Sequence, residues 1–230
     1  MLSEADFIER IRNRARYVRN PSQRTPDRET AFNNADNVER QLQEDGHTIW
    51  GWVIYRCTYE DDQEWEAFMD RLRYYNENTL RFHNALDMQS SLDYHVFEDR
   101  DRFNNIHPSA VLEHFTQWVA NAPQQEQGEG AHPARSQRYN YCLHVDQEAL
   151  QSVIGGPTPP ADNFGPGYVN LVCKEIIGGM RPEHTDGRAE RDYCFMRINY
   201  QKLMVNWYSQ LRPQGSWGNE YRIPPEVARI

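Results

Sequence analysis

The sequence predicts an α+β fold: a ferredoxin-like sandwich with a mixed sheet, helices mainly on one face and an N-terminal extension of two helices. After residue 47, segments typical of strands and of helices alternate, which implies crossover connections and a sheet with helices packed on it. Residues 48–59, TIWGWVIYRCTY, are the longest run of β-forming residues and predict the central strand. We therefore expect residues 1–46 to form a helical extension and residues 47–230 to form a single α+β domain. The alternative is a doubly wound parallel sheet, but no glycine-rich turn follows the first strand.

Two polar helices are expected before the central strand, over residues 3–19 and 27–44. Their apolar residues recur at helical spacing in a thin stripe on each segment. Five arginines decorate the first helix, and a solvated helix face explains them better than binding to a nucleic acid or a membrane surface. Both helices are so polar that they need to lie on another surface to persist.

The elements expected after residue 47 follow from apolar periodicity and from the turn residues between them. In chain order they are a strand at 48–59, a helix from 62 to about 84, a strand at 92–98, a helix at 109–121, a strand at 138–146, a helix at 147–154, strands at 168–177 and 192–199, and a helix at 201–211. Residues 123–135 and 155–167 have the composition of loops.

Composition and charge limit the classes of function that are compatible with this chain. Its 230 residues are 38% hydrophobic and 12% aromatic, with a mean hydropathy of −0.91, which predicts a lean core that depends on buried rings. The net charge of −9 argues against non-specific nucleic-acid binding. No run approaches the roughly 18 apolar residues of a membrane span, and the first residues lack the apolar core of a secretory signal. We therefore expect a cytoplasmic protein without nucleic-acid or membrane partners.

The four cysteines, Cys57, Cys142, Cys173 and Cys194, all fall in predicted strands, and none forms a CxxC pair. This pattern favours structural thiols in an intracellular protein over zinc ligands. The histidines outside the strands lack paired acid spacing, apart from a local loop cluster at residues 183–186. We expect no metal and no cofactor.

Five stretches of the chain stand out: WGWVIYRCTY, DDQEWEAFM, YHVFEDRD, YCLHVDQEAL and YVNLV. Together they resemble a family of small uncharacterised proteins of filamentous fungi, over residues 50–211. The most specific part of the resemblance is a strand followed by an acidic helix cap. The resemblance implies a fungal intracellular protein and implies no particular activity.

Polar residues inside the predicted strands form the candidate site. If the strands face the same way, one side of the sheet carries cationic, amide and aromatic side chains together: Trp52, Arg56, His95, Asn140, His144, Asn170, Lys174 and Arg197. Such a face would bind a small organic anion. His95 and His144 would act as general acid or base, and the other six residues would bind the substrate. The alternative for Arg56 is an ion pair with a neighbouring strand or helix.

We therefore expect a small-metabolite-binding protein, whose enzymatic form would be a cofactor-independent lyase, isomerase or cyclase. No metal motif, phosphate loop or nucleophile elbow is present, so the chemistry would depend on proton transfer. The alternative is a non-enzymatic interaction or scaffold protein that forms a homodimer through the same sheet face. A register shift of one residue would send the site residues of a strand to the opposite face, so the sequence leaves both hypotheses open.

Overall fold

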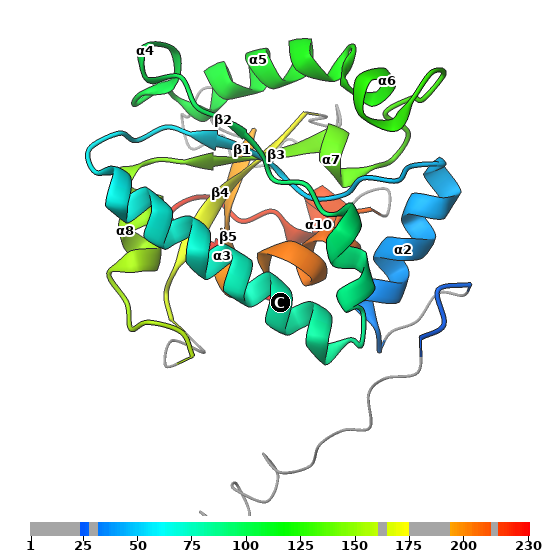
Figure 1. The fold of residues 1–230 in the computed structure, drawn as a ribbon. Helices are drawn as coiled ribbons and strands as arrows, with labels where there is room; N and C mark the ends of the chain where they lie inside the picture. Colours follow the sequence, from blue (N-terminus) through cyan, green and yellow to red (C-terminus); the bar gives the residue numbers. More distant parts are fainter. Residues whose placement is uncertain (1–23, 28–31, 161–164, 175–193, 213–215) are drawn as a thin grey trace, which may run out of the picture.

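The protein is built around a six-stranded mixed sheet (Figure 1). The computed structural model describes residues 24–27, 32–160, 165–174, 194–212 and 216–230. The strands are β1 Val53–Arg56, β2 His95–Phe97, β3 Tyr141–Val145, β4 Tyr168–Cys173, β5 Phe195–Asn199 and β6 Val227–Ala228. Their order in the sheet is β2-β1-β3-β4-β5-β6. β1 pairs in parallel with both β2 and β3, the β3–β4 and β4–β5 pairs are antiparallel, and β6 is parallel to β5.

The mixed sheet confirms the coarse fold class, but the chain does not adopt the ferredoxin-like topology, in which neighbouring strands are antiparallel. The chain passes through α3 (Asp62–Phe82) to place β2 on one side of β1, and through α5 (Pro108–Val119) to place β3 on the other. The two helices pack on opposite faces, because α3 belongs to the larger apolar core and α5 to the smaller one. Over these three strands the winding is that of the alternative prediction, a doubly wound sheet.

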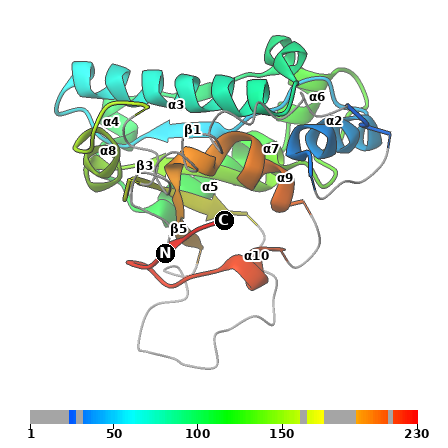
Figure 2. The ribbon, with the colours of Figure 1, turned by 90° about the horizontal axis from the view of Figure 1, so that it is seen from below.

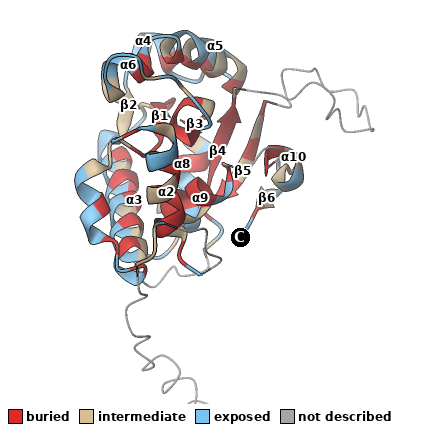
Figure 3. Cartoon of the chain, turned by 90° about the vertical axis from the view of Figure 1, so that its right-hand side faces the viewer, coloured by how far each residue is buried: buried red, intermediate tan, exposed pale blue. Residues whose placement is uncertain are grey.

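Helices cover both faces of the sheet, and the central strands β1, β3 and β4 are buried (Figure 3). The larger core lies under α2 Asn34–Asp45, α3, α8 Gln147–Ile154, the short helices η3 Tyr200–Lys202 and η4 Leu203–Trp207, and α9 Tyr208–Gln210. The smaller core lies under α4 Arg100–Phe103, α5 and α6 Ala122–Gln127. The other helices in the described residues are η1 Leu86–Ser91, α7 Gln137–Asn140 and α10 Ser216–Glu220.

The long helix α3 follows directly from its sequence. Asp61 caps its N-terminus by accepting hydrogen bonds from the backbone N–H groups of Gln63 and Glu64. Its buried residues recur at helical spacing and point to the larger core: Trp65, Phe68, Met69, Leu72, Asn76 and Leu80. Full burial of one such aromatic or leucine side chain stabilises the fold by about 1.5–3 kcal/mol. The helix therefore presents its opposite side to solvent over its whole length.

The second of the two predicted N-terminal helices lies in the described part of the chain, and it packs differently from the expected separate extension. The helix expected over residues 3–19 lies outside the described residues. The second helix begins later than expected, at Asn34, because Asn33 provides the N-cap. Ala35 and Val38 are fully buried in the larger core, and Asn33 Nδ2 donates to the carbonyl of His83 at 3.1 Å, which holds α2 beside the end of α3 (Figure 2). This helix is therefore part of the main core.

Other segments differ from the prediction for local reasons. Residues 123–135, expected as a loop, contain most of α6, since a proline is tolerated in the first turn of a helix. Residues 137–140 form a helical turn, so β3 begins later than expected. Residues 200–210 form 3₁₀, π and α turns in succession instead of one α-helix. The ends of the predicted strands 168–177 and 192–199 lie partly outside the described residues.

The four cysteines are all buried, as structural thiols should be. Burial is the main cause that raises the pKa of Cys57 and of Cys142, which keeps both as neutral thiols. In the described part of the chain, no helix combines the length and the apolar character needed to cross a membrane.

Candidate functional site

The structure divides six of the eight predicted site residues between the two faces of the sheet, and the other two, Asn140 and Lys174, lie just outside the strands. Side chains alternate along β1, so Trp52 and Arg56 point away from the face that carries Val53 and Tyr55. The expectation that Trp52 and Arg56 share a face with the two histidines is therefore wrong, because the register of the strands could not be read from the sequence. Strand pairing places four of the predicted residues on the opposite face: His95, His144, Asn170 and Arg197.

Arg56 forms ion pairs at the carboxyl end of β1, as the alternative prediction for this residue states. Its Nη2 donates to Asp62 Oδ1, and its Nη1 is 3.8 Å from Glu98 Oε2. Its Nε donates to the carbonyl of Thr58 at 3.0 Å. The guanidinium also lies over the ring of Trp65, 5.2 Å from the ring centroid. Arg56 therefore joins β1 to α3 instead of facing a ligand.

His144 is buried and uses both ring nitrogens inside the fold. Nε2 donates to the carbonyl of Ile106 at 2.9 Å, so Nδ1 accepts from Asn170 Nδ2 at 3.1 Å. Burial is the main cause that lowers the pKa of His144, although the Asp146 carboxylate, 3.7 Å from Nδ1, opposes the shift. The imidazole is therefore neutral at pH 7, and it has no ring nitrogen left for a substrate.

Asn140 and Lys174 lie just outside the ends of β3 and β4, whereas Arg197 lies in the middle of β5. Asn140 Nδ2 donates to the carbonyl of Ser136 at 2.8 Å, and the Asn140 carbonyl accepts from the backbone N–H of Lys174 at 2.8 Å. Arg197 Nη2 donates to Glu148 Oε2 at 2.8 Å. These contacts hold the antiparallel part of the sheet, and the eight residues do not converge on one site.

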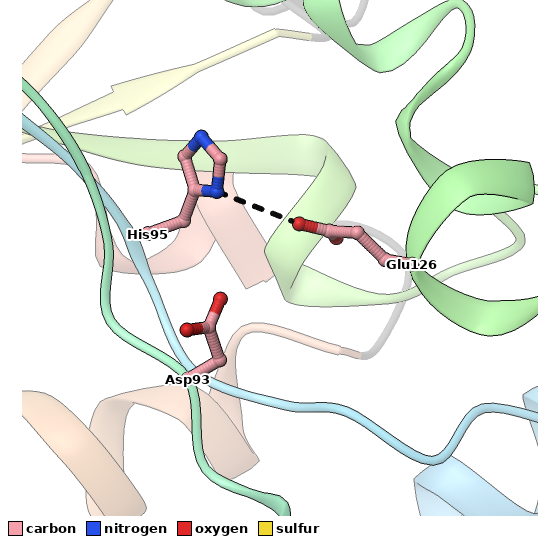
Figure 4. Close-up of side chains that lie close together, drawn as sticks. All are labelled: Asp93, His95 and Glu126. Atoms are coloured by element: carbon pink, nitrogen blue, oxygen red, sulfur yellow. Dashed lines mark ion pairs between the residues drawn. The ribbon is translucent and has the colours of Figure 1, made fainter.

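His95 belongs to a polar cluster at the amino ends of the parallel strands (Figure 4). His95 begins β2, Asp93 lies two residues before it, and Glu126 extends from α6. Nδ1 of His95 is 3.7 Å from Glu126 Oε1, and one ligating atom from each of the three side chains lies within 4.8 Å of the others. A histidine and two carboxylates at this spacing are the residue types of a metal site.

The guanidinium of Arg138 forms ion pairs with both carboxylates of this cluster, those of Glu126 and Asp93. Arg138 is fully buried, and its Nε and Nη2 each donate to one oxygen of Glu126 at 2.7 Å. Nη2 also donates to Asp93 Oδ2 at 2.5 Å. A divalent cation on the same carboxylates would be repelled by this guanidinium. The cluster is therefore an ion-pair network that joins α6 to the amino ends of β1 and β2.

The imidazole of His95 remains partly accessible at the edge of this network, with 35% of its side-chain surface exposed. Its ring contacts those of Phe97 and Trp118, with centroid distances of 4.6 and 5.1 Å. Burial is the main cause that lowers the pKa of His95, the charge of Arg138 adds to the shift, and the carboxylates oppose it. His95 can exchange a proton with solvent, but His144 lies two strands away with both nitrogens engaged. The two histidines therefore do not form an acid–base pair.

A pocket of about 430 Å³ lies between the C-terminal half of α3 and the η3–η4 segment. Its volume falls in the range of roughly 300–1,000 Å³ that is typical of small-molecule sites. One wall consists of three successive pairs along α3 and its C-cap: Tyr74 and Tyr75, Asn78 and Thr79, Phe82 and His83. The other wall consists of Gln201, Lys202 and Asn206.

The helical repeat explains why the three pairs line one wall. Residues four positions apart lie above one another on a helix, so the pairs stack on consecutive turns. The rings of Tyr74 and Tyr75 pack edge to face at one end, with centroids 5.5 Å apart, and those of Phe82 and His83 do so at the other, at 5.1 Å. Phe82 is 58% exposed and Tyr74 is 38% exposed, so aromatic surface is accessible at the pocket.

The opposite wall combines the 3₁₀ helix η3, which carries Gln201 and Lys202, with the π-helix η4, which carries Asn206. π-Helices are rare and are frequently found at functional sites. The indole N–H of Trp52 donates to the carbonyl of Leu203 at 3.0 Å, and the indole N–H of Trp207 donates to Asn199 Oδ1 at 2.7 Å. Trp52, predicted as a ligand-binding residue, is fully buried and instead anchors this wall from behind.

Sequence reasoning missed this pocket although one half of it leaves a signal. The doublets YY, NT and FH recur every four residues near the end of the predicted helix. That recurrence marks a face with aromatic ends and a polar middle. The other half depends on where η3 and η4 pack, which local patterns do not determine.

Comparisons of this chain with protein-family models, with curated proteins and with solved structures found no match. The resemblance to fungal proteins therefore stays a prediction, and the function has to be inferred from the geometry of the chain.

Proposed function

We propose that the protein binds a small organic molecule in the pocket between α3 and the η3–η4 segment. The observation that carries this proposal is the combination of ligand-sized volume and lining. Aromatic rings at both ends offer apolar contact, while amide groups between them and on the facing wall offer hydrogen bonds. This mixture of apolar surface and a few oriented polar groups is typical of metabolite sites. The proposal keeps the predicted class of ligand, a small metabolite, but places its binding site beside α3 and not on the face of the sheet.

A binding function agrees better with the lining than acid–base catalysis does. The described lining contains one imidazole, that of His83, and no carboxylate. Burial is the main cause that lowers the pKa of His83; the charge of Lys202 adds to the shift, and that of Asp36 opposes it. His83 is therefore neutral at pH 7 and suited to hydrogen bonding, and the described lining contains no carboxylate that could act with it as a general acid.

The alternative of a homodimer through the sheet face is not favoured by the packing. α5 covers the face that carries His144 and Asn170, and Val111 and Phe115 are fully buried against it. The same face cannot also be the core of an interface unless α5 leaves it.

A ligand screen with a pocket-filling variant tests the proposal. The melting temperature of the full chain is measured against a metabolite library, for the wild type and for Asn78→Trp. Asn78 is exposed on α3 and lines the pocket, so a tryptophan there fills the space without disturbing the core. The matched control is Gln63→Trp, which places the same ring on an exposed amide position of α3 about four turns away.

We expect at least one metabolite to raise the melting temperature of the wild type and of Gln63→Trp, with the shift lost in Asn78→Trp. A stabilising metabolite whose shift is the same in all three proteins binds elsewhere, and that result would overturn the proposal. So would a library in which no compound stabilises the wild type.

A further inference from the structure

We propose that the ligand of this pocket is a small aromatic carboxylate, with its ring between the aromatic ends of the pocket and its carboxylate against the ammonium of Lys202. This inference rests on the proposed function and narrows it to one chemical class.

The charge of the pocket differs from that of the protein. The chain has a net charge of −9, yet the described lining contains the ammonium of Lys202 and no carboxylate. Lys202 is exposed and makes no hydrogen bond or ion pair with a residue that the structure describes. In contrast, the guanidinium groups of Arg56, Arg138 and Arg212 all pair with carboxylates. The pocket therefore offers an unneutralised cation to a ligand on an otherwise acidic protein.

The ammonium of Lys202 lies close enough to the pocket to affect its other wall. His83 closes the opposite wall, and the charge of Lys202 contributes, after burial, to the lowered pKa of that imidazole. An anionic group bound near Lys202 would thus lie within reach of both walls. The amide groups of Asn78 and Asn206 also line the pocket without a hydrogen bond to any described residue, so they can serve a bound polar group.

A carboxylate fits this cation better than a phosphate does. Phosphate sites usually combine several cations, bidentate arginines or the N-terminus of a helix. The pocket wall is formed by the C-terminal half of α3, whose dipole disfavours a doubly charged anion, and its described lining has no arginine. One ammonium neutralises one carboxylate.

The two aromatic ends favour a flat ring as the body of the ligand. Tyr74 and Phe82 lie two helical turns apart on α3 and expose 38% and 58% of their surface. A planar ring system laid along this wall would lie between the two exposed rings and remove part of their apolar surface from water. The preference for a planar ring over a flexible chain follows from this geometry.

Calorimetric titration of the full chain with a matched pair of probes tests the chemical class. The probes are 2-naphthoate and 2-naphthamide, which share the ring and differ in the charge of the substituent. We expect the wild type to bind 2-naphthoate more tightly, and Lys202→Gln to weaken 2-naphthoate about three- to tenfold while leaving 2-naphthamide unchanged. Lys202→Arg keeps the charge and should retain most of the affinity for 2-naphthoate.

A second measurement locates the carboxylate by its effect on Lys202. The chain has 25 lysine and arginine residues, of which only Lys174 and Lys202 are lysines. Limited acetylation with an amine-selective reagent, followed by peptide mass spectrometry, therefore compares two side chains. We expect saturating 2-naphthoate to slow acetylation of Lys202 severalfold and to leave the internal reference, Lys174, unchanged.

The outcomes separate the inference from the proposed function. If both probes bind equally, Lys202→Gln changes neither affinity, and Asn78→Trp abolishes both, the pocket binds small molecules but the carboxylate assignment is wrong. If Asn78→Trp changes neither affinity, both the pocket and the inference are refuted. If neither probe binds, the aromatic-carboxylate class is refuted, and the metabolite screen decides the proposed function separately.

Discussion

Replacement of Arg138 by methionine should destabilise the fold more than loss of any surface ion pair. Arg138 is fully buried, and its guanidinium donates to both oxygens of Glu126, to Asp93 Oδ2, and to the carbonyls of Gly51 and Asp93 at 3.1 Å each. Methionine keeps much of the apolar volume and removes every donor. Glu126, whose side chain is only 15% exposed, would then lose its ion-pair partner and keep the hydrogen bond from the hydroxyl of Tyr139. Removal of one partner from such a pair costs about 3–5 kcal/mol.

Urea unfolding followed by circular dichroism measures this cost. The matched control is Arg81→Met, since Arg81 forms an ion pair with Glu77 on the exposed side of α3 and is itself 61% exposed. That change should cost about 0–1 kcal/mol. Arg138→Lys keeps the positive charge but loses the forked geometry of the guanidinium, so its loss of unfolding free energy should lie between those of the two methionine variants. It also provides a folded protein to measure if Arg138→Met does not fold. A loss for Arg138→Met no larger than for Arg81→Met would refute the role of the network.

Two further predictions concern the sheet and its turns. The pKa of His144 is lowered in the fold from the ordinary value of 6.5, so the unfolded chain binds the proton first and stability falls as the pH drops below about 6.5. His144→Gln should therefore reduce the loss of unfolding free energy between pH 7.5 and pH 5.5, and an unchanged loss would contradict this. Gly51 has a φ of +116°, and an added Cβ would lie 2.5 Å from the carbonyl oxygen of Asp93, whereas Gly128 has a φ of +106° and no atom within 4 Å. Gly51→Ala should therefore lower the melting temperature clearly more than Gly128→Ala, since both share the strain and only the first adds the clash; equal shifts would argue against the close approach.

Elements that depend on local chemistry could be predicted from the sequence. α3 and α8 begin where Asp61 and Asp146 provide caps, and the predicted range of α8 agrees with the structure. The core of the central strand lies within the predicted run, at Val53–Arg56. Strand order was beyond this reasoning, because a strand–helix–strand unit has the same sequence pattern whichever neighbour its second strand joins.

The site was harder to predict than the fold for a physical reason. Polar residues inside strands stand out in a sequence, but burial obliges them to find partners within the protein. His144 forms hydrogen bonds with Ile106 and Asn170, and Arg56 forms an ion pair with Asp62, so both side chains stabilise the fold. Groups that stay available to a ligand, such as Lys202, lie at the surface, where no periodicity distinguishes them from ordinary solvated residues.

The carboxyl ends of the parallel strands show why we place the proposed binding site elsewhere. In doubly wound sheets, ligands usually bind in the crevice outside these ends, where the winding reverses between two neighbouring strands. Here that crevice lies between β1 and β3, and the hydroxyl of Thr58 donates across it to Gln147 Oε1. The N-termini of α3 and α8, which could have held an anion, are occupied by the carboxylates of Asp61 and Asp146. Arg56 neutralises the acids beside them. Because this end of the sheet satisfies its own donors and charges, it offers little to a ligand. The proposed pocket beside the C-terminal half of α3 differs, since its Lys202 pairs with no carboxylate among the described residues.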